Sequence, residues 1–201
     1  MIVTLIDYGA GNVTSVERAL ARLGATTQRS NSPECIAKAE VLLLPGVGHY
    51  GALIRALDER SLRVPLLDAI RRGIPFLGIC LGLQALYDSS EEAPELTGLK
   101  LFPGSVRSLP STVKLPHMGW NQLKLTRPSR LLEGISTEAY FYFAHTFAAT
   151  GFNGEALALC NHGTDFAAVI EKQNIFAVQF HPEKSGEAGS RLLHNFLTGC
   201  C

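Results

Sequence analysis

Short apolar runs alternate with helical hydrophobic periodicity along the first part of the chain. Three of these runs predict buried strands, at Ile2–Ile6, Val41–Leu44 and Pro75–Ile79. Between them, apolar residues recur at helical spacing, which predicts helices near residues 13–23, 52–57 and 65–72. Strands that alternate with helices in this way form a mostly parallel sheet that is covered by helices on both faces.

The pattern changes after a further predicted helix at Leu81–Leu86. Residues 88–138 contain prolines and turn signals, so we expect loops and short antiparallel strands there. Stronger strand patterns follow at residues 139–143, 155–159, 166–171 and 174–180, before a final amphipathic helix around Leu192–Leu197. We therefore predict an α/β fold in a single domain of residues 1–201. Its core is an open, mostly parallel, flavodoxin-like sheet with helices on both faces and a smaller antiparallel extension.

The composition is that of a folded globular chain, with 46% apolar residues, 18% charged residues and a formal net charge of zero. A neutral chain without lysine- or arginine-rich runs is a poor non-specific binder of nucleic acid. The N-terminus does not have the pattern of a secretory signal, and no apolar run approaches the roughly 20 residues that span a bilayer. We expect a soluble, cytoplasmic protein whose substrate is small or whose partner is another protein.

The five cysteines follow no zinc-binding spacing and are odd in number, which argues against a disulfide framework. The sequence indicates no metal site and no cofactor. Cys160 follows an apolar run and is expected in the core, Cys35 lies in a polar segment, and Cys200 and Cys201 end the chain. Cys80 remains, and it lies within a motif.

Cys80 lies in Gly78-Ile79-Cys80-Leu81-Gly82, where a predicted buried strand meets a predicted helix. So short a turn requires a strained backbone, and the flanking glycines remove side chains that would collide. The spacing matches the Gly-x-Ser-x-Gly elbow of α/β-hydrolases, with cysteine in the serine position. The N-terminus of the helix favours the thiolate, which is the nucleophilic form. The alternative is a buried structural cysteine beside packing glycines.

A nucleophilic cysteine needs a base, and the base needs a group that orients it. The segment Gln179-Phe180-His181-Pro182-Glu183 follows the last predicted strand. Residues i and i+2 of an extended chain point to the same side, so Glu183 can accept a hydrogen bond from one nitrogen of His181. The other nitrogen is then free to face Cys80. Taken alone, this segment is more typical of a surface turn.

The loop Pro45-Gly46-Val47-Gly48 also follows a predicted strand. Its glycines allow backbone amides to approach a ligand closely, and the amide of Leu81 is a second donor beside the nucleophile. Because sites in parallel sheets lie at the carboxyl ends of the strands, these elements can converge at one edge. Nucleophile, base, orienting group and oxyanion donors together predict acyl transfer through a thioester.

These motifs resemble those of the class I, or triad, glutamine amidotransferase family, which has a Gly-x-Cys-x-Gly elbow, a glutamine shortly after it and a late His-Pro-Glu. The resemblance covers essentially the whole chain, including the opening Ile6–Asn12 and the run Pro116–Asn121. It implies that Cys80 attacks the side-chain amide of glutamine, that His181 deprotonates the thiol and then protonates the ammonia, and that Glu183 holds His181. It also implies a set of residues around the substrate and the oxyanion: Gly46, Val47, Gly48, Leu81, Gln84, His145 and Thr146.

The resemblance is strongest to the branch of the family that supplies ammonia to a (β/α)8-barrel synthase subunit in histidine biosynthesis. It implies a heterodimer with that subunit, and it places four residues toward the partner: Asn12, Trp120, Tyr142 and Lys184. It also implies that the amides of residues 45–48 switch when the partner carries its ligand. One departure is that Thr146 and Phe147 stand where the family usually has Ser and Tyr.

Other functions fit part of this pattern. A glutaminase of another synthase, as in anthranilate or guanylate synthesis, would share the triad, but the run Pro116–Asn121 argues against it. A non-enzymatic binding or redox-sensing protein on a similar fold could present a reactive cysteine, but it would not need His181 and Glu183. Trp120, taken alone, is equally compatible with a partly buried core position.

Overall fold

The computed structural model describes residues 1–9, 13–151 and 154–199. Within this part of the chain, the central sheet contains a row of parallel strands, in the order β2 (Thr26–Ser30), β1 (Ile2–Ile6), β3 (Val41–Gly46), β4 (Phe76–Cys80) and β13 (Ile175–Val178). It continues through antiparallel strands, in the order β12 (Asp165–Lys172), β11 (Ala156–Asn161) and β8 (Lys124–Leu125). The order of the parallel strands is that of a flavodoxin-like sheet, so the predicted fold class is confirmed.

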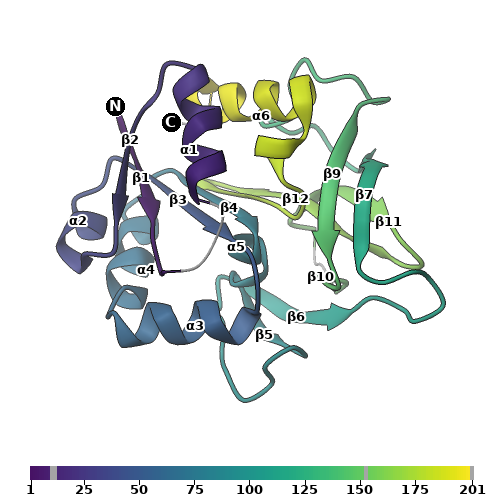
Figure 1. Ribbon diagram of the computed structural model, residues 1–201, viewed down its shortest axis with the longest axis horizontal. Helices are drawn as coiled ribbons and strands as arrows, with labels where there is room; N and C mark the ends of the chain where they lie inside the picture. Colours follow the sequence, from purple (N-terminus) through teal and green to yellow (C-terminus); the bar gives the residue numbers. More distant parts are fainter. Residues whose placement is uncertain (10–12, 152–153, 200–201) are drawn as a thin grey trace.

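Helices cover both faces of this sheet (Figure 1). One face carries α1 (Val13–Arg22) and α6 (Gly186–Gly199), and their apolar sides join one buried cluster. The opposite face carries α2 (Pro33–Ala37), α3 (Tyr50–Glu59) and α4 (Arg63–Arg71), which join a second cluster. The sheet therefore separates two apolar layers, which explains why the inner parallel strands are apolar on both faces.

Two smaller sheets form the predicted extension. β7 (His117–Gln122) pairs antiparallel with β9 (Tyr140–His145). β6 (Phe102–Ser108) lies between β10 (Phe147–Ala149), to which it is antiparallel, and β5 (Tyr87–Ser90), to which it is parallel. In the part of the chain that the structure describes, no helix is both long enough and apolar enough to cross a membrane.

Three local features differ from the pattern-based expectation. β2 was not expected, because its sequence Thr-Thr-Gln-Arg-Ser has no apolar run; parallel pairing with β1 makes it an edge strand. α2 was not expected either, although Ser32 caps it by accepting from the Cys35 amide at 3.4 Å. The helix predicted from Leu81 is the single short turn α5 (Leu81–Gln84), because the chain soon enters β5 to pair with β6.

Candidate active site

Cys80 is the last residue of β4 and directly precedes α5. Its φ of 55° and ψ of −106° lie outside the regions that residues with a Cβ usually adopt. A Cβ on Gly82 would lie 2.0 Å from the Leu44 carbonyl oxygen, and one on Gly78 would lie 2.7 Å from the Gly82 oxygen. Both flanking glycines are therefore required for this strained turn, as the sequence predicts.

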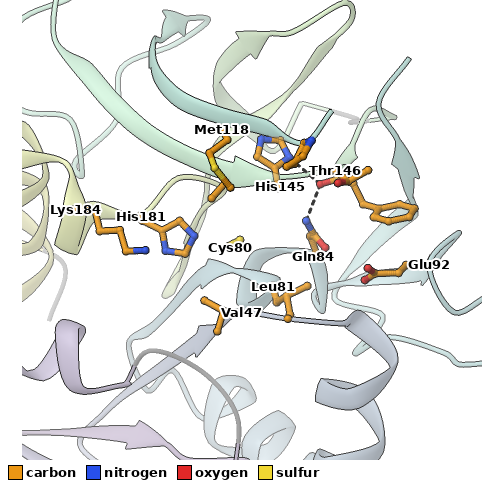
Figure 2. Close-up of a pocket in the computed structure, with 14 residues that line it drawn as sticks. Val47, Cys80, Leu81, Gln84, Glu92, Met118, His145, Thr146, His181 and Lys184 are labelled. Carbon is orange, nitrogen blue, oxygen red and sulfur yellow. Dashed lines mark hydrogen bonds between the residues drawn. The ribbon is translucent and has the colours of Figure 1, made fainter. Parts of the chain in front are cut away.

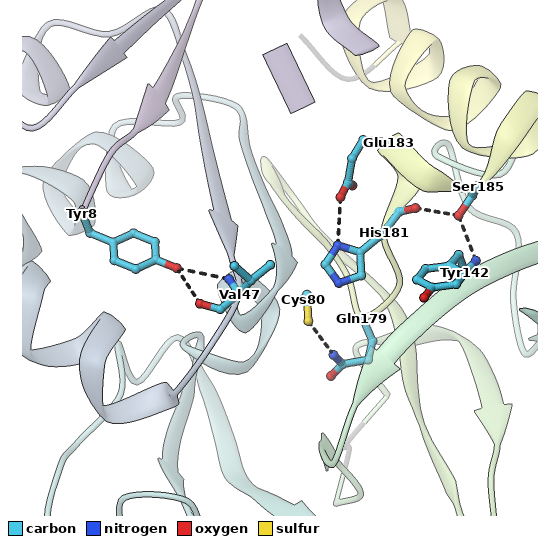
Figure 3. A network of polar contacts seen from close by, with 8 residues as sticks. All are labelled: Tyr8, Val47, Cys80, Tyr142, Gln179, His181, Glu183 and Ser185. Carbon is cyan, nitrogen blue, oxygen red and sulfur yellow. Dashed lines mark hydrogen bonds and ion pairs between the residues drawn. The ribbon is translucent and has the colours of Figure 1, made fainter. Parts of the chain in front are cut away.

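The ring of His181 lies between Cys80 and Glu183 (Figure 3). Its Nδ1 is 2.9 Å from Glu183 Oε1, and the two side chains are only 3% and 1% exposed. The expected contact is present and His181 itself is extended, but the chain does not continue as a strand to Glu183. β13 ends at Val178, and Pro182–Lys184 form the 3-10 turn η1, which is closed by hydrogen bonds from the Lys184 and Ser185 amides. This turn, not strand alternation, brings the carboxylate to the ring.

The charge on His181 results from burial on one side and from its neighbours Cys80 and Glu183 on the other. Burial disfavours its imidazolium form, but the hydrogen bonds and negative charges of Cys80 and Glu183 outweigh burial and raise the pKa of His181 to about 10. The ring therefore carries a proton at neutral pH. The proton that a leaving group would need is already on His181 before a substrate binds.

Buried amides hold the sulfur from another side. Gln179 Nε2 donates to Cys80 Sγ at 3.5 Å. Gln84 Nε2 donates to Gln179 Oε1 at 3.1 Å and to the Phe147 carbonyl oxygen at 2.7 Å. Gln84 Oε1 is buried and has no hydrogen-bond partner in the described part of the chain. Because Gln84 lines the pocket over Cys80, this oxygen is free to accept from a ligand.

The loop after β3 lies beside the nucleophile, because Gly46 pairs with Cys80 in the parallel register. A Cβ on Gly46 would lie 2.5 Å from Leu81 Cβ, so this glycine serves the close packing of β3 on α5 and not the approach of a ligand. The Val47 amide donates to Tyr8 Oη at 3.2 Å, and Tyr8 Oη donates to the Val47 carbonyl oxygen at 3.4 Å. Figure 3 shows Val47 between Tyr8 and Cys80, with its amide on the Tyr8 side.

A pocket of about 420 Å³ opens over Cys80 (Figure 2). It brings together many of the residues expected at the site: Val47, Gly48, Cys80, Leu81, Gln84, His145, Thr146 and His181. Gly46 and Glu183 lie behind this lining, in contact with Leu81 and His181. Glu92, which the sequence analysis did not name, adds a carboxylate, and it accepts from the Tyr50 amide at 2.6 Å. The size and the mixed lining suit a small polar molecule.

His145 forms part of the pocket wall, but its two ring nitrogens are engaged within the protein. Burial lowers the pKa of His145 to about 3, so the ring is neutral. Nδ1 lies 2.9 Å from the Phe147 carbonyl oxygen, which only accepts, so Nδ1 carries the hydrogen. Nε2 then accepts from His117 Nδ1 at 3.1 Å. His145 therefore shapes the pocket and fixes Phe147.

The family model for class-I glutamine amidotransferases matches residues 4–200 of the chain. The imidazole glycerol phosphate synthase subunit HisH of Methanothermobacter thermautotrophicus is 46% identical over 196 residues, and the match covers 98% of each chain. The chain belongs to the class-I glutamine amidotransferase family. The HisH subunit of Deinococcus radiodurans is 42% identical, over 96% of this chain and 92% of that protein.

Solved structures agree with the class-I glutamine amidotransferase fold. A structure described as a glutamine amidotransferase superposes with a TM-score of 0.78 at 20% identity, covering 98% of this chain and 97% of the other. PurLQS from Thermotoga maritima superposes with a TM-score of 0.77 at 19% identity, covering 98% of both chains. At these identities the likeness concerns the fold alone.

In this class-I glutamine amidotransferase, exposed apolar side chains gather on the β7–β9 hairpin. Trp120 is 54% exposed, which excludes a core position, and its ring meets that of Tyr142 edge-on with centroids 5.9 Å apart. Lys184 Nζ lies 5.6 Å from the centroid of the Tyr142 ring, and Lys184 also lines the pocket over Cys80. Asn12 lies outside the described residues. These contacts join the hairpin surface to the pocket.

The departure at Thr146 and Phe147 is accommodated by main-chain contacts. The Thr146 carbonyl oxygen accepts from the Leu109 amide at 2.9 Å, and the Phe147 oxygen accepts from Gln84 and His145. Any residue supplies such oxygens, so these main-chain contacts do not depend on the side chains at the two positions. Cys160 is buried in the core as predicted, and burial raises the pKa of its thiol to about 12, which makes it unreactive at neutral pH.

Sequence reasoning missed three residues of the site, namely Tyr8, Glu92 and Gln179. Tyr8 and Gln179 both lie inside motifs named above, but nothing in the spacing of Tyr8 indicates a contact with Val47. Glu92 lies in a turn-rich segment where acidic residues are normally solvated. A signal was available for Gln179 alone: it is placed two residues before His181, next to the end of a buried strand.

Proposed function

We propose that this protein is a glutaminase that hydrolyses glutamine to glutamate and ammonia through a thioester on Cys80. The observation that carries the proposal is the Cys80–His181–Glu183 arrangement at the floor of a pocket of suitable size. A strained turn presents the sulfur, and a protonated imidazole lies beside it. This is the geometry that acyl transfer to a thiolate requires.

In the proposed reaction, Cys80 Sγ attacks the side-chain amide carbon of glutamine and forms a tetrahedral intermediate with a negative oxygen. His181 transfers its proton to the amide nitrogen, the carbon–nitrogen bond breaks, and ammonia leaves. Water, deprotonated by the now neutral His181, attacks the thioester and releases glutamate and the thiolate. Glu183 keeps the ring oriented and stabilises its charge throughout.

The pocket offers matching groups for the rest of the substrate. Glu92 supplies a carboxylate for the α-ammonium group of an amino acid, and Gln84 Oε1 is an acceptor without a hydrogen-bond partner in the described part of the chain. The amides of Leu81 and of the loop at Gly46, Val47 and Gly48 are the donors proposed for the negative oxygen, and the Val47 amide can act only after it leaves Tyr8. Thr146 and His145 close the opposite wall.

We further propose that the protein is the glutaminase subunit of imidazole glycerol phosphate synthase in histidine biosynthesis. The names of its HisH relatives, which describe them as a subunit of imidazole glycerol phosphate synthase, support this proposal. Its partner would be a (β/α)8-barrel subunit that uses the ammonia to make imidazole glycerol phosphate and AICAR. The surface around Trp120, Tyr142 and Lys184 supports a partner on this side, because exposed aromatic residues are typical of interfaces. Asn12 is assigned to the same interface.

The decisive experiment measures ammonia release from glutamine, with and without the barrel subunit and its nucleotide substrate. We expect weak hydrolysis by the chain alone and a large rise when the liganded partner is added. Cys80→Ala should abolish hydrolysis in both conditions while leaving the circular dichroism spectrum unchanged. Cys35→Ala, at a half-buried cysteine outside the site, is the matched control and should behave as wild type.

Two results would contradict the proposal. Undiminished hydrolysis by Cys80→Ala would exclude the thioester mechanism. The protein would then fit the alternative of a binding or redox-sensing function. Stimulation by another synthase, but not by the barrel subunit, would support the glutaminase activity and contradict the proposed partner.

A further inference from the structure

Tyr8 lies directly after β1, next to the loop that follows β3, and it is only 2% exposed. Its hydroxyl makes two hydrogen bonds to one residue of that loop. It accepts from the Val47 amide at 3.2 Å and donates to the Val47 carbonyl oxygen at 3.4 Å. One side chain therefore holds both peptide groups that flank the Val47 Cα (Figure 3).

The position of Val47 makes this contact relevant to chemistry. Gly46 pairs with Cys80 in the parallel register, so the Val47 amide is the first N–H that follows the strand residue beside the nucleophile. Val47 and Leu81 both line the pocket in which a negative oxygen would form. The Val47 amide faces Tyr8 instead of this space, so it cannot donate to a substrate while the contact lasts.

The neighbouring residues allow this peptide to turn. Gly46 precedes Val47, and Gly48 follows it with a φ of +94°, in a region that glycine adopts without strain. Glycines on both sides of one valine leave the peptide groups freer to rotate than any other flanking residue would. The hydroxyl of Tyr8 is then the main side-chain restraint on the Val47 amide.

We propose that Tyr8 is a positioning residue whose hydroxyl restrains the Val47 peptide with its N–H turned away from the reacting carbonyl, so that release of this contact limits glutamine hydrolysis. The inference rests on the proposed glutaminase function and concerns the regulation of the same site. Burial raises the pKa of Tyr8 to about 12 against the opposing bond to Val47. The hydroxyl thus keeps its hydrogen at working pH and can both donate and accept.

The test is Tyr8→Phe, which keeps the ring and removes only the hydroxyl. In the chain alone, we expect kcat for glutamine hydrolysis to rise roughly 3- to 30-fold, the factor that two modest hydrogen bonds represent. KM should change little, because Glu92 and Gln84 are untouched. The stimulation by the barrel partner should shrink by a similar factor, because the variant has already released the Val47 amide that the partner would otherwise have to release. Tyr8→Leu removes the same hydroxyl and should give the same direction if the Phe variant does not fold.

Tyr50→Phe is the matched control. Tyr50 is buried like Tyr8, but its hydroxyl has no hydrogen-bond partner in the described part of the chain. Its removal should leave kcat and KM unchanged. A second control is the alkylation of Cys80 by iodoacetamide, followed by peptide mass spectrometry. Alkylation needs the thiolate but forms no oxyanion, so its rate should be the same in wild type and in Tyr8→Phe.

The outcomes separate this inference from the proposed function. An unchanged or lower kcat in folded Tyr8→Phe would overturn the role of Tyr8. Equal acceleration of alkylation and hydrolysis would also overturn it, because the variant would then have opened the site in general. Failure of the proposed function looks different: the wild-type chain with the liganded barrel subunit would release no ammonia.

Discussion

Glu183 illustrates how strongly single residues of the site depend on one another. Its carboxylate is 1% exposed, one oxygen meets His181 Nδ1, and Oε2 is buried without a hydrogen-bond partner in the described part of the chain. A carboxylate that has been taken out of water needs a compensating charge. The protonated ring of His181 provides it, and Cys80 is the second neighbour whose hydrogen bond and charge raise the pKa of this ring. The charge on His181 therefore depends on both Cys80 and Glu183.

Glu183→Gln tests this dependence through pH. The raised pKa of His181 means that its proton is present from acidic pH up to about 10 and is lost above that value. Removing the Glu183 charge lowers this pKa toward the ordinary 6.5, so the alkaline limb of kcat/KM should move to lower pH. We also expect kcat to fall by roughly 10²-fold, at the lower end of what general acid–base catalysis contributes.

The measurement is a pH–rate profile of partner-activated hydrolysis. An alkaline limb that stays in place in Glu183→Gln would show that the carboxylate orients His181 without supporting its charge. Glu187→Gln, at an exposed position of the first turn of α6, serves as the control and should leave the profile unchanged.

At the scale of elements, β9 is the strand that supports the turn η1. The His181 amide donates to the Tyr142 carbonyl oxygen at 2.8 Å. Ser185 Oγ donates to the His181 carbonyl oxygen at 2.6 Å and accepts from the Tyr142 amide at 3.0 Å. The strand that presents aromatic residues at the surface therefore also fixes the backbone of the base. A displacement of β9 by a partner would reach His181 through these hydrogen bonds.

Ser185→Ala should break this support. The variant leaves a buried carbonyl oxygen and a buried amide without their shared hydroxyl, which should lower the free energy of unfolding by about 1–3 kcal/mol. Because His181 loses its restraint, kcat should fall more than KM rises. Urea unfolding and steady-state kinetics measure both effects. Ser190→Ala, at an exposed position of α6, is the control, and equal behaviour of the two variants would contradict the proposed support.

For the whole molecule, the site lies where the parallel strands β3 and β4 end, and residues of the β7–β9 hairpin line one side of it. The sheet supplies the nucleophile and the loop after β3, and the hairpin side supplies the wall formed by His145 and Thr146. The hairpin also carries three exposed large apolar side chains, those of Met118, Trp120 and Tyr140. A partner that binds the hairpin would thus touch the element that borders the pocket.

Trp120→Ala should weaken binding of the barrel subunit by at least roughly tenfold, because a large exposed aromatic residue is a common anchor of interfaces. Hydrolysis by the chain alone should stay unchanged, since Trp120 does not line the pocket. Isothermal titration calorimetry with the barrel subunit gives the affinity. Val64→Ala is the control, because Val64 is 65% exposed and belongs to α4, a helix that lies away from β7 and β9 in Figure 1. Equal affinities of the two variants for the barrel subunit would show that Trp120 is not part of the interface.

Features that depend on neighbouring residues were predictable. The apolar strands, the helices with one apolar face, and the glycine-flanked turn at Cys80 each follow from local spacing and from the steric needs of the backbone. The edge strand β2 was not predictable, because a strand at the edge of a sheet is held by its partner's main chain and needs no apolar pattern of its own.

By itself, the sequence determined the flavodoxin-like class, the strained turn at Cys80 and the identity of His181 and Glu183, because each rests on order and spacing along the chain. Only the tertiary structure decided how Cys80 is supported. Gln179 meets its sulfur across 99 positions of the chain, and Tyr8 meets Val47 across 39. Such contacts depend on how strands align in the folded sheet, and the neighbours Cys80 and Glu183 then set the charge on His181 against the effect of burial.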